Sequence, residues 1–248
     1  MALFDGVKAK VARVDDHLND LDAALSGVDP RTRHVVVISR EIPPTANVVN
    51  ISERLPEEPA RISLLVGEVL HQLRSALDHL IGRLEAANGR ERESGFEFPI
   101  FWDRGRFKRE GFQRFQGVST GAADVIERCQ PYHRPAPSYK DHPLWILHDL
   151  NNTDKHRVII PTKAAITVDN LDINIAPGAS KEIVLSVAPE HRFPVIGSTI
   201  NPATGERWTL NATFERFGSV ANHPIIPGLV QLRDVVRQIV AECIGLHP

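Results

Sequence analysis

Apolar residues recur at helical spacing in three long stretches of the chain. The first stretch covers residues 4–25, the second residues 60–87 and the third residues 227–244. Spacings of three and four residues place apolar side chains on one face of an α-helix. The pattern therefore predicts three long amphipathic helices, and each of them must bury one face against another element.

A different pattern marks the remaining apolar segments, which are short and rich in β-branched residues. HVVVIS and NVVNIS, within residues 34–52, read as a hairpin, and the segment PLWILHDLNNTDKH (143–156) reads as a further helix. Five β-rich runs between residues 158 and 217 are separated by turn residues. We therefore expect an α+β fold: a helical bundle core, a C-terminal, mostly antiparallel sheet and a closing C-terminal helix.

This pattern also suggests how the chain divides. Residues 1–157 form a mainly helical region with a short hairpin, and residues 158–248 form a β-rich section with the last helix. We expect both parts to pack as one compact unit, because 248 residues suffice for one large domain.

Composition narrows the class of protein only slightly. The chain is 42% hydrophobic and 24% charged, and its formal net charge of −2 provides no general attraction for nucleic acid. Cys129 and Cys243 are the only cysteines, which is too few for a disulfide framework. No apolar run is long enough to span a bilayer. We expect a cytoplasmic protein with reduced thiols and no membrane partner.

The helix predicted over residues 60–87 has an unusual polar side. On a helical wheel His71, Arg74 and Asp78 form one stripe, and His79 flanks it. Arg74 and Asp78 are four residues apart, so they can pair directly. Arg74 borders the apolar side, and we therefore expect it to be partly buried.

A second polar cluster lies in the helix predicted over residues 143–156. His148, Asn152 and His156 recur every four residues, and Asp149, Asp154 and Lys155 lie nearby. We expect this helix to pack against the one that carries Arg74. The two polar stripes then either line a functional cleft or form a buried, mutually paired structural network, since buried polar groups need partners.

The order of four segments within residues 60–158 resembles a family of functionally uncharacterised bacterial proteins. These segments are LHQLRSALDHL, FPIF, IERCQPYH and LWILHDLNNTDKHR. The resemblance implies no known activity.

Arg74 and His79 also fit the R-x4–6-H pattern of HEPN domains, which the chain distantly resembles. These domains are helical bundles, often dimeric, and many are metal-independent ribonucleases. The resemblance implies that Arg74 stabilises charge on the scissile phosphate and that His79 transfers protons. It further implies RNA as partner, a homodimer, no cofactor, and a role in nucleic-acid processing or binding, in defence or stress response. The alternative is a non-catalytic interaction protein whose Arg, His and Asp residues form a structural network.

One further segment, RGRFKREGFQRF (104–115), interleaves cations with aromatic residues. Such a mixture suits single-stranded nucleic acid, through phosphate contacts and base stacking. Alternatively, the phenylalanines anchor the segment in the core and the cations stay in water. The candidate nucleic-acid contacts are Arg104, Arg106, Lys108, Arg109 and Arg114.

Metal and nucleophile chemistry have less support in the sequence. His71, Asp78, His148, Asp149 and His156 are of types that bind Zn, Mn or Fe. No compact metal-ligand motif, nucleophile elbow or phosphate-binding glycine loop is present. We therefore expect no metal and no cofactor.

Overall fold

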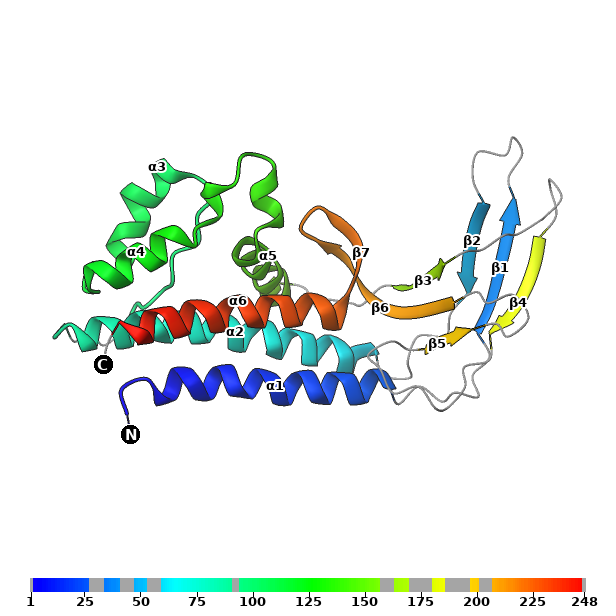
Figure 1. Ribbon diagram of the computed structural model, residues 1–248, viewed down its shortest axis with the longest axis horizontal. Coiled ribbons are helices and arrows are strands. Elements are labelled where there is room, and N and C mark those ends of the chain that lie inside the picture. Colours follow the sequence, from blue (N-terminus) through cyan, green and yellow to red (C-terminus); the bar gives the residue numbers. More distant parts are fainter. Residues whose placement is uncertain are drawn as a thin grey trace.

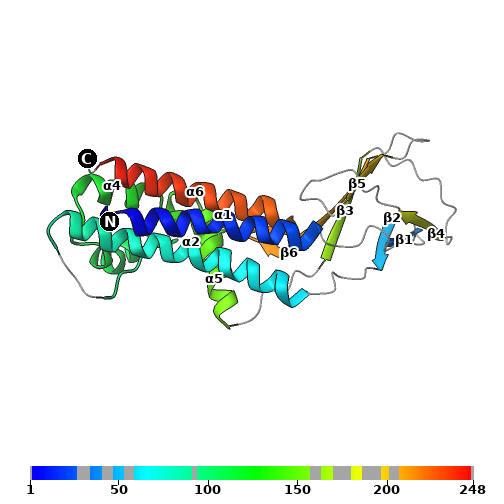
Figure 2. The same ribbon diagram turned by 90° about the horizontal axis from the view of Figure 1, so that it is seen from below.

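The computed structural model of the protein describes residues 2–26, 34–40, 47–52, 59–90, 94–156, 163–169, 180–185, 197–200 and 207–246. Its body is built on three long helices that run side by side (Figures 1 and 2). They are α1 (Asp5–Ser26), α2 (Pro59–Ala87) and α6 (Ile225–Gly245). The three helices predicted from the apolar spacing are thus present.

The three helices bury the apolar faces that their sequences provide. Val7, Val14 and Leu21 of α1 have no exposed surface, and neither do Leu229 and Val236 of α6. Helix α2 lies against both of these helices, and its apolar stripe is fully buried: Leu70, Leu73, Leu77, Leu80, Ile81 and Leu84. Because α1 and α6 cover this stripe within a single chain, it does not supply the dimer interface that the HEPN resemblance implies.

Residues 94–156 pack over α2 and α6 as a series of short helices and one longer helix. The short elements are α3 (Arg104–Arg106), η1 (Phe107–Gly111), η2 (Phe112–Arg114), α4 (Thr120–Arg128), η3 (Pro131–His133) and η4 (Ser138–Asp141). The longer helix is α5 (Pro143–His156), which packs against α2 and α6. Ser119 caps α4, because its hydroxyl oxygen accepts a hydrogen bond from the Ala122 N–H at 3.4 Å.

The strands pair with one another through their backbones, and every pairing among the described residues is antiparallel. Their bounds are β1 (His34–Arg40), β2 (Asn47–Ser52), β3 (Lys163–Asp169), β4 (Ser180–Leu185), β5 (Gly197–Ile200), β6 (Arg207–Phe217) and β7 (Val220–Pro224). One sheet has the order β2-β1-β4, with Val37 opposite Asn50 and Glu182. The other has the order β3-β6-β5, and β7 also pairs with β6. The hairpin expected over residues 34–52 corresponds to the β1–β2 pair.

The expectation of an α+β fold, with a helical bundle core and a C-terminal, mostly antiparallel sheet, is wrong, because the structure is mostly helical. Among the residues whose side chains the structure places, 76% are helical and 3% lie in strands. The strands extend from one end of the helices rather than over their faces (Figure 1). At that end, Phe214 and Phe217 of β6 join the helical core. The physical reason is that α1, α2 and α6 bury one another's apolar faces, so the bundle needs no sheet as a cover.

The structure also bears on the membrane question. Among the helices that it describes, none is long and apolar enough to cross a bilayer.

Candidate functional site

The centre of the predicted polar stripe is a buried ion pair. Arg74 is 7% exposed, and its Nη2 lies 2.9 Å from Oδ1 of Asp78, one helical turn away. The direct pairing and the burial of Arg74 were both predicted from the spacing. Asp78 is less enclosed, with 31% of its side chain exposed. The pair therefore lies at the inner edge of the polar side of α2.

Both members of this pair also bind the chain segment that precedes α3. Nη2 of Arg74 donates to the Phe98 carbonyl oxygen at 2.8 Å, and Oδ1 of Asp78 accepts from the Phe98 N–H at 2.8 Å. Phe98 itself has no exposed surface. The ion pair thus holds both backbone polar groups of one buried residue, much as a neighbouring strand would.

Glu97 extends this arrangement toward the surface. One of its carboxylate oxygens lies 3.5 Å from Nη2 of Arg74, and the same oxygen pairs with Arg114. The guanidinium of Arg114 also lies over the Phe101 ring, 5.2 Å from its centroid. Arg74 therefore has two carboxylates and a carbonyl oxygen around it, and this set of contacts holds Glu97 and Phe98 on α2.

Burial has the largest effect on the ionisation of this pair. It lowers the pKa of Arg74, while the charges of Asp78 and Glu97 oppose that shift. It raises the pKa of Asp78, against the influence of Arg74 and of the Phe98 N–H. Nη1 of Arg74 is buried and has no hydrogen-bond partner among the described residues. The contacts that Arg74 does make are directed at the protein's own backbone and carboxylates.

Helix α5 packs against α2, as the two polar segments predicted. The positive charge of Arg74 is near enough to His148 to lower the pKa of that imidazole, after the larger effect of burial. Nε2 of His148 lies 3.0 Å from the side-chain nitrogen of Asn152. The packing of α5 against α2 is confirmed, and the charges of Arg74 and Lys155 act between the two polar stripes.

The other predicted members of the α5 cluster are more peripheral. Asp149 and Lys155 are exposed, although the charge of Lys155 lowers the pKa of Asp78. The Asp154 carboxylate lies beside Gly67, where an added Cβ would come within 2.6 Å of it. The side chain of His156 lies outside the described residues. The supporting cluster is thus divided between the helix contact and the surface.

The two histidines of α2 do not take part in the Arg74 pair. His71 is exposed, one turn before Arg74. His79 instead accepts a hydrogen bond from Nε of Arg83 at 3.1 Å, through its Nε2. Its ring lies against Gly6 of α1, where an added Cβ would come within 2.8 Å of it. Burial and the charges of Arg83 and Lys10 lower the pKa of His79. Arg74 and His79 therefore bind different parts of the protein.

The basic and aromatic segment forms a helical turn sequence with one buried stripe. Phe107, Gly111 and Phe115 recur every four residues and are all buried. Gly111 fits closely, because an added Cβ would lie 2.9 Å from the Phe107 ring and 3.0 Å from the Phe101 ring. Two of the phenylalanines therefore anchor this segment, as the alternative interpretation predicted.

The opposite side of this segment is exposed and carries free cations. Arg104, Lys108 and Phe112 also recur every four residues, and Phe112 is 52% exposed. Arg106 is paired with Glu110 at 2.9 Å, and Arg114 with Glu97. Lys108 and Arg109 are exposed and have no carboxylate partner among the described residues. Of the five candidate nucleic-acid contacts, Lys108 and Arg109 remain available to an outside anion. Arg104 can join them, because its pair with Glu127 is long, at 3.9 Å, and exposed to water.

An exposed tryptophan lies two residues before Arg104 in the chain, and the sequence interpretation did not select it. Trp102 is 45% exposed and stacks on Tyr139, with ring centroids 5.4 Å apart and an interplanar angle of 22°. Tyr139 in turn makes an edge contact with Trp145 of α5. The Trp102 ring is thus held from one side by an aromatic support, and the pattern of residues 104–115 alone could not indicate it.

Gln130 is a second residue that sequence reasoning missed. It is fully buried, accepts from the Phe101 N–H at 3.0 Å, and donates to the carbonyl oxygens of Pro99 and Ile126, each at 2.9 Å. The only signal of this role in the sequence was the glutamine in IERCQPYH, whose side-chain amide can both donate and accept hydrogen bonds. Gln130 therefore fixes the backbone that leads from Phe98 to Trp102.

Metal and thiol chemistry have little support in the structure. Within the ranges that it describes, no group of three or more His, Cys, Asp or Glu side chains could hold a metal ion. Cys129 and Cys243 are free thiols, and burial raises the pKa of each to about 12. Thiols of this kind are protonated and poorly nucleophilic at neutral pH.

His142 gives the fold a specific sensitivity to acid. Its Nδ1 accepts the Leu144 N–H at 3.2 Å at the start of α5, which requires the neutral ring. Its pKa is lowered to about 4, first by burial and then by the charges of Arg134 and His133. Because the unfolded chain binds this proton at higher pH, stability should fall between pH 6.5 and about 4.

We expect His142 to account for about 2 kcal/mol of this acid loss, less than the full pKa shift implies, because its ring is only partly buried and water screens the charge. The measurement is urea unfolding of the wild type and of His142→Asn, an amide that can still cap the helix, across this pH range. The variant should lose less stability than the wild type as the pH falls. Parallel curves for the two proteins would contradict the assignment.

Comparisons with known proteins supply no further guide to this site. No family model, no curated protein and no solved structure matches the chain.

Proposed function

We propose that this protein binds single-stranded nucleic acid through an exposed surface formed by Trp102, Arg104, Lys108, Arg109 and Phe112, called here the 102–112 surface. The observation that carries the proposal is Trp102, which is 45% exposed and supported from behind by Tyr139. An exposed aromatic ring in a basic segment is what base stacking and phosphate binding require.

Local charge supports the same proposal. Residues 102–115 contain five cations and two carboxylates, although the whole chain has a net charge of −2. Arg106 and Arg114 are occupied by Glu110 and Glu97, which leaves Arg104, Lys108 and Arg109 for phosphates. The basic residues are therefore concentrated in the same stretch of chain as the two exposed aromatic residues, Trp102 and Phe112.

The proposed function is binding of nucleic acid only. It does not include RNA cleavage by Arg74 and His79. A HEPN-type enzyme would need both side chains to reach one phosphodiester. Here Arg74 is 7% exposed and binds Asp78 and Phe98, whereas His79 binds Arg83 and lies against α1. The burial of Arg74 favours the structural-network interpretation of these residues.

The test is fluorescence anisotropy with a short labelled oligouridine and its DNA counterpart, in the presence of a chelator. Trp102→Ala should weaken binding about tenfold, since stacking on one aromatic ring is worth about 1–3 kcal/mol. The double variant Lys108→Gln and Arg109→Gln should reduce the salt dependence, lowering the slope of log K against log salt by about 1.4. Arg13→Gln, an exposed arginine on α1, is the matched control and should bind as the wild type does.

Two results would overturn the proposal. One is that the wild type does not bind the oligonucleotides, or that both sets of substitutions leave its affinity unchanged while circular dichroism shows intact folds. The other is RNA cleavage in chelator that His79→Ala abolishes. That result would show the ribonuclease activity implied by the HEPN resemblance.

A further inference from the structure

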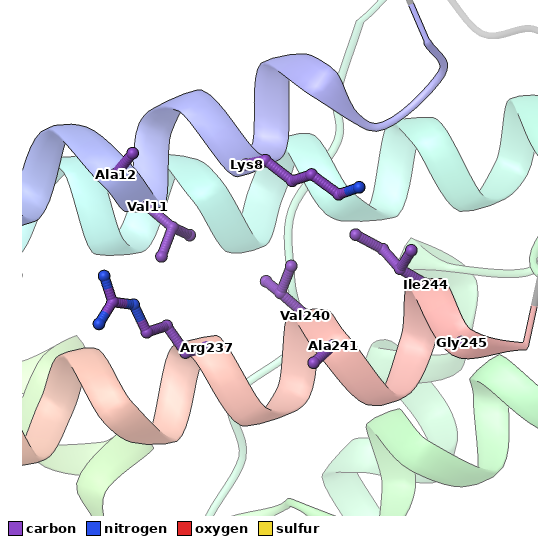
Figure 3. Close-up of a pocket in the computed structure, with 8 residues that line it drawn as sticks. All are labelled: Lys8, Val11, Ala12, Arg237, Val240, Ala241, Ile244 and Gly245. Carbon is purple, nitrogen blue, oxygen red and sulfur yellow. The ribbon is translucent and has the colours of Figure 1, made fainter.

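Helices α1 and α6 border a shallow hollow that is open to solvent, near the end of the bundle where the N- and C-termini lie (Figures 1 and 3). Its volume is about 480 Å³, within the ordinary range for small-molecule sites. Val11 projects from α1, and Val240 and Ile244 project from α6, so the floor is apolar. The hollow is separate from the Arg74 network and from the 102–112 surface, and no part of the proposed function uses it.

Small residues form part of the rim of this hollow. Ala12 on α1 and Ala241 and Gly245 on α6 are exposed, and none of them has a side chain long enough to reach across it. Gly245 meets nothing within 4 Å of an added Cβ, which shows that the space beside it is open. The hollow is called here the α1–α6 groove. It follows from the sequence, because only larger side chains at these positions could close it.

Two cations stand at opposite ends of the apolar floor. Lys8 extends over the end near Ile244, and Arg237 lies by Val11 (Figure 3). Arg237 is committed to the Asp15 carboxylate, which Arg233 also binds at 3.1 Å. Lys8 is exposed and has no acidic partner in the described part of the chain. No carboxylate lines the groove itself, so its uncompensated charge is the ammonium of Lys8.

We propose that the α1–α6 groove binds an aliphatic carboxylate of medium chain length. The alkyl chain lies on Val11 and Val240, and the carboxylate binds Nζ of Lys8. The α6 lining from Arg237 to Gly245 covers eight residue steps, or about 12 Å of helix. An apolar chain of that length with one terminal negative charge matches both the floor and the single free cation. An alkyl chain without an anionic head group would leave the ammonium group of Lys8 without an ionic partner in the groove.

Calorimetric titration with decanoate, below its micelle concentration, tests the proposal on the full chain. Decanol carries the same alkyl chain without the charge, and acetate carries the charge without the chain. Decanoate should bind more tightly than either. Lys8→Gln should weaken decanoate binding about tenfold and leave decanol unchanged, because a hydrogen bond to a charged group is lost.

Filling the groove should abolish binding of both long-chain ligands. Ala241→Phe does this from α6, and Ala12→Phe does it from α1, so a variant that fails to fold leaves the other. Lys155→Gln, an exposed lysine on α5, is the control and should bind decanoate normally. The proposal is overturned if decanoate fails to bind, if Lys8→Gln leaves its affinity unchanged, or if a folded groove-filling variant still binds it. Oligouridine binding should be the same in all these variants, so the two proposals fail independently.

Discussion

Replacement of Asp78 by alanine is expected to lower the free energy of unfolding by about 3 kcal/mol. Arg74, whose side chain is 9% exposed, would lose its nearest carboxylate, and the buried Phe98 N–H would lose its acceptor. A buried cation without its partner costs more than the pair itself contributes. Urea unfolding followed by circular dichroism measures the change.

A double-mutant cycle separates this effect from simple loss of packing. In Arg74→Met the cation is gone, so the added substitution Asp78→Ala should cost clearly less than it does in the wild type. Asp149→Ala, which removes an exposed carboxylate of α5, should change stability by less than about 0.5 kcal/mol. Equal costs of Asp78→Ala in both backgrounds would mean that the pair is not coupled.

Gln130→Ala is the second substitution with a large expected effect, again about 3 kcal/mol. The side chain makes three hydrogen bonds, to the Phe101 N–H and to the carbonyl oxygens of Pro99 and Ile126. Gln130 has no exposed surface, so water cannot replace these bonds without entering the core. The measurement is the urea midpoint together with the unfolding slope.

The chemistry of the side chain, rather than its volume, should set this cost. Gln130→Glu keeps the size and an acceptor but loses the two N–H donors, and it places a charge in the core. It should therefore be at least as destabilising as the alanine variant at neutral pH. Gln113→Ala, an exposed glutamine of η2, serves as the control. A mild effect of Gln130→Glu would show that the two donated bonds contribute little.

The long helices could be predicted because their signal is local. In α1, α2 and α6 the apolar residues repeat at helical spacing, and burial follows from that repeat. The same holds for the Arg74–Asp78 pair, since residues four apart on a helix are neighbours. Residues 94–142 have no apolar repeat as long as those of α1, α2 and α6, so their short elements were not predicted in detail.

The partners of the site could not be predicted, because they come from distant parts of the chain. Phe98 is twenty residues beyond Asp78, and Gln130 is twenty-nine beyond Phe101. His79 is an instructive example. Its place on the wheel suggested a flank of the Arg74 stripe, but the absence of a side chain at Gly6 gives its ring a place against α1.

The fold class was wrong for a related reason. A β-branched run indicates an extended backbone, and strands such as β3 and β6 do occur where such runs were noted. The run does not say what the strand packs on. Helices α1, α2 and α6 already bury one another's apolar faces. The core formed by the described side chains therefore does not need a sheet to cover it.

The course of the chain around the bundle has a consequence for how homologous sequences can vary in length. The chain leaves the helices after α1 and returns at α2, and it leaves after α5 and returns through β6 and β7, each time on the side of the strands (Figure 1). Insertions and deletions at these two places would leave the packed helix faces in register. The same change between α2 and α4 would pull Phe98 from Arg74 or Phe101 from Gln130. Length variation among relatives should therefore gather in the two strand-bearing connections and avoid residues 94–130.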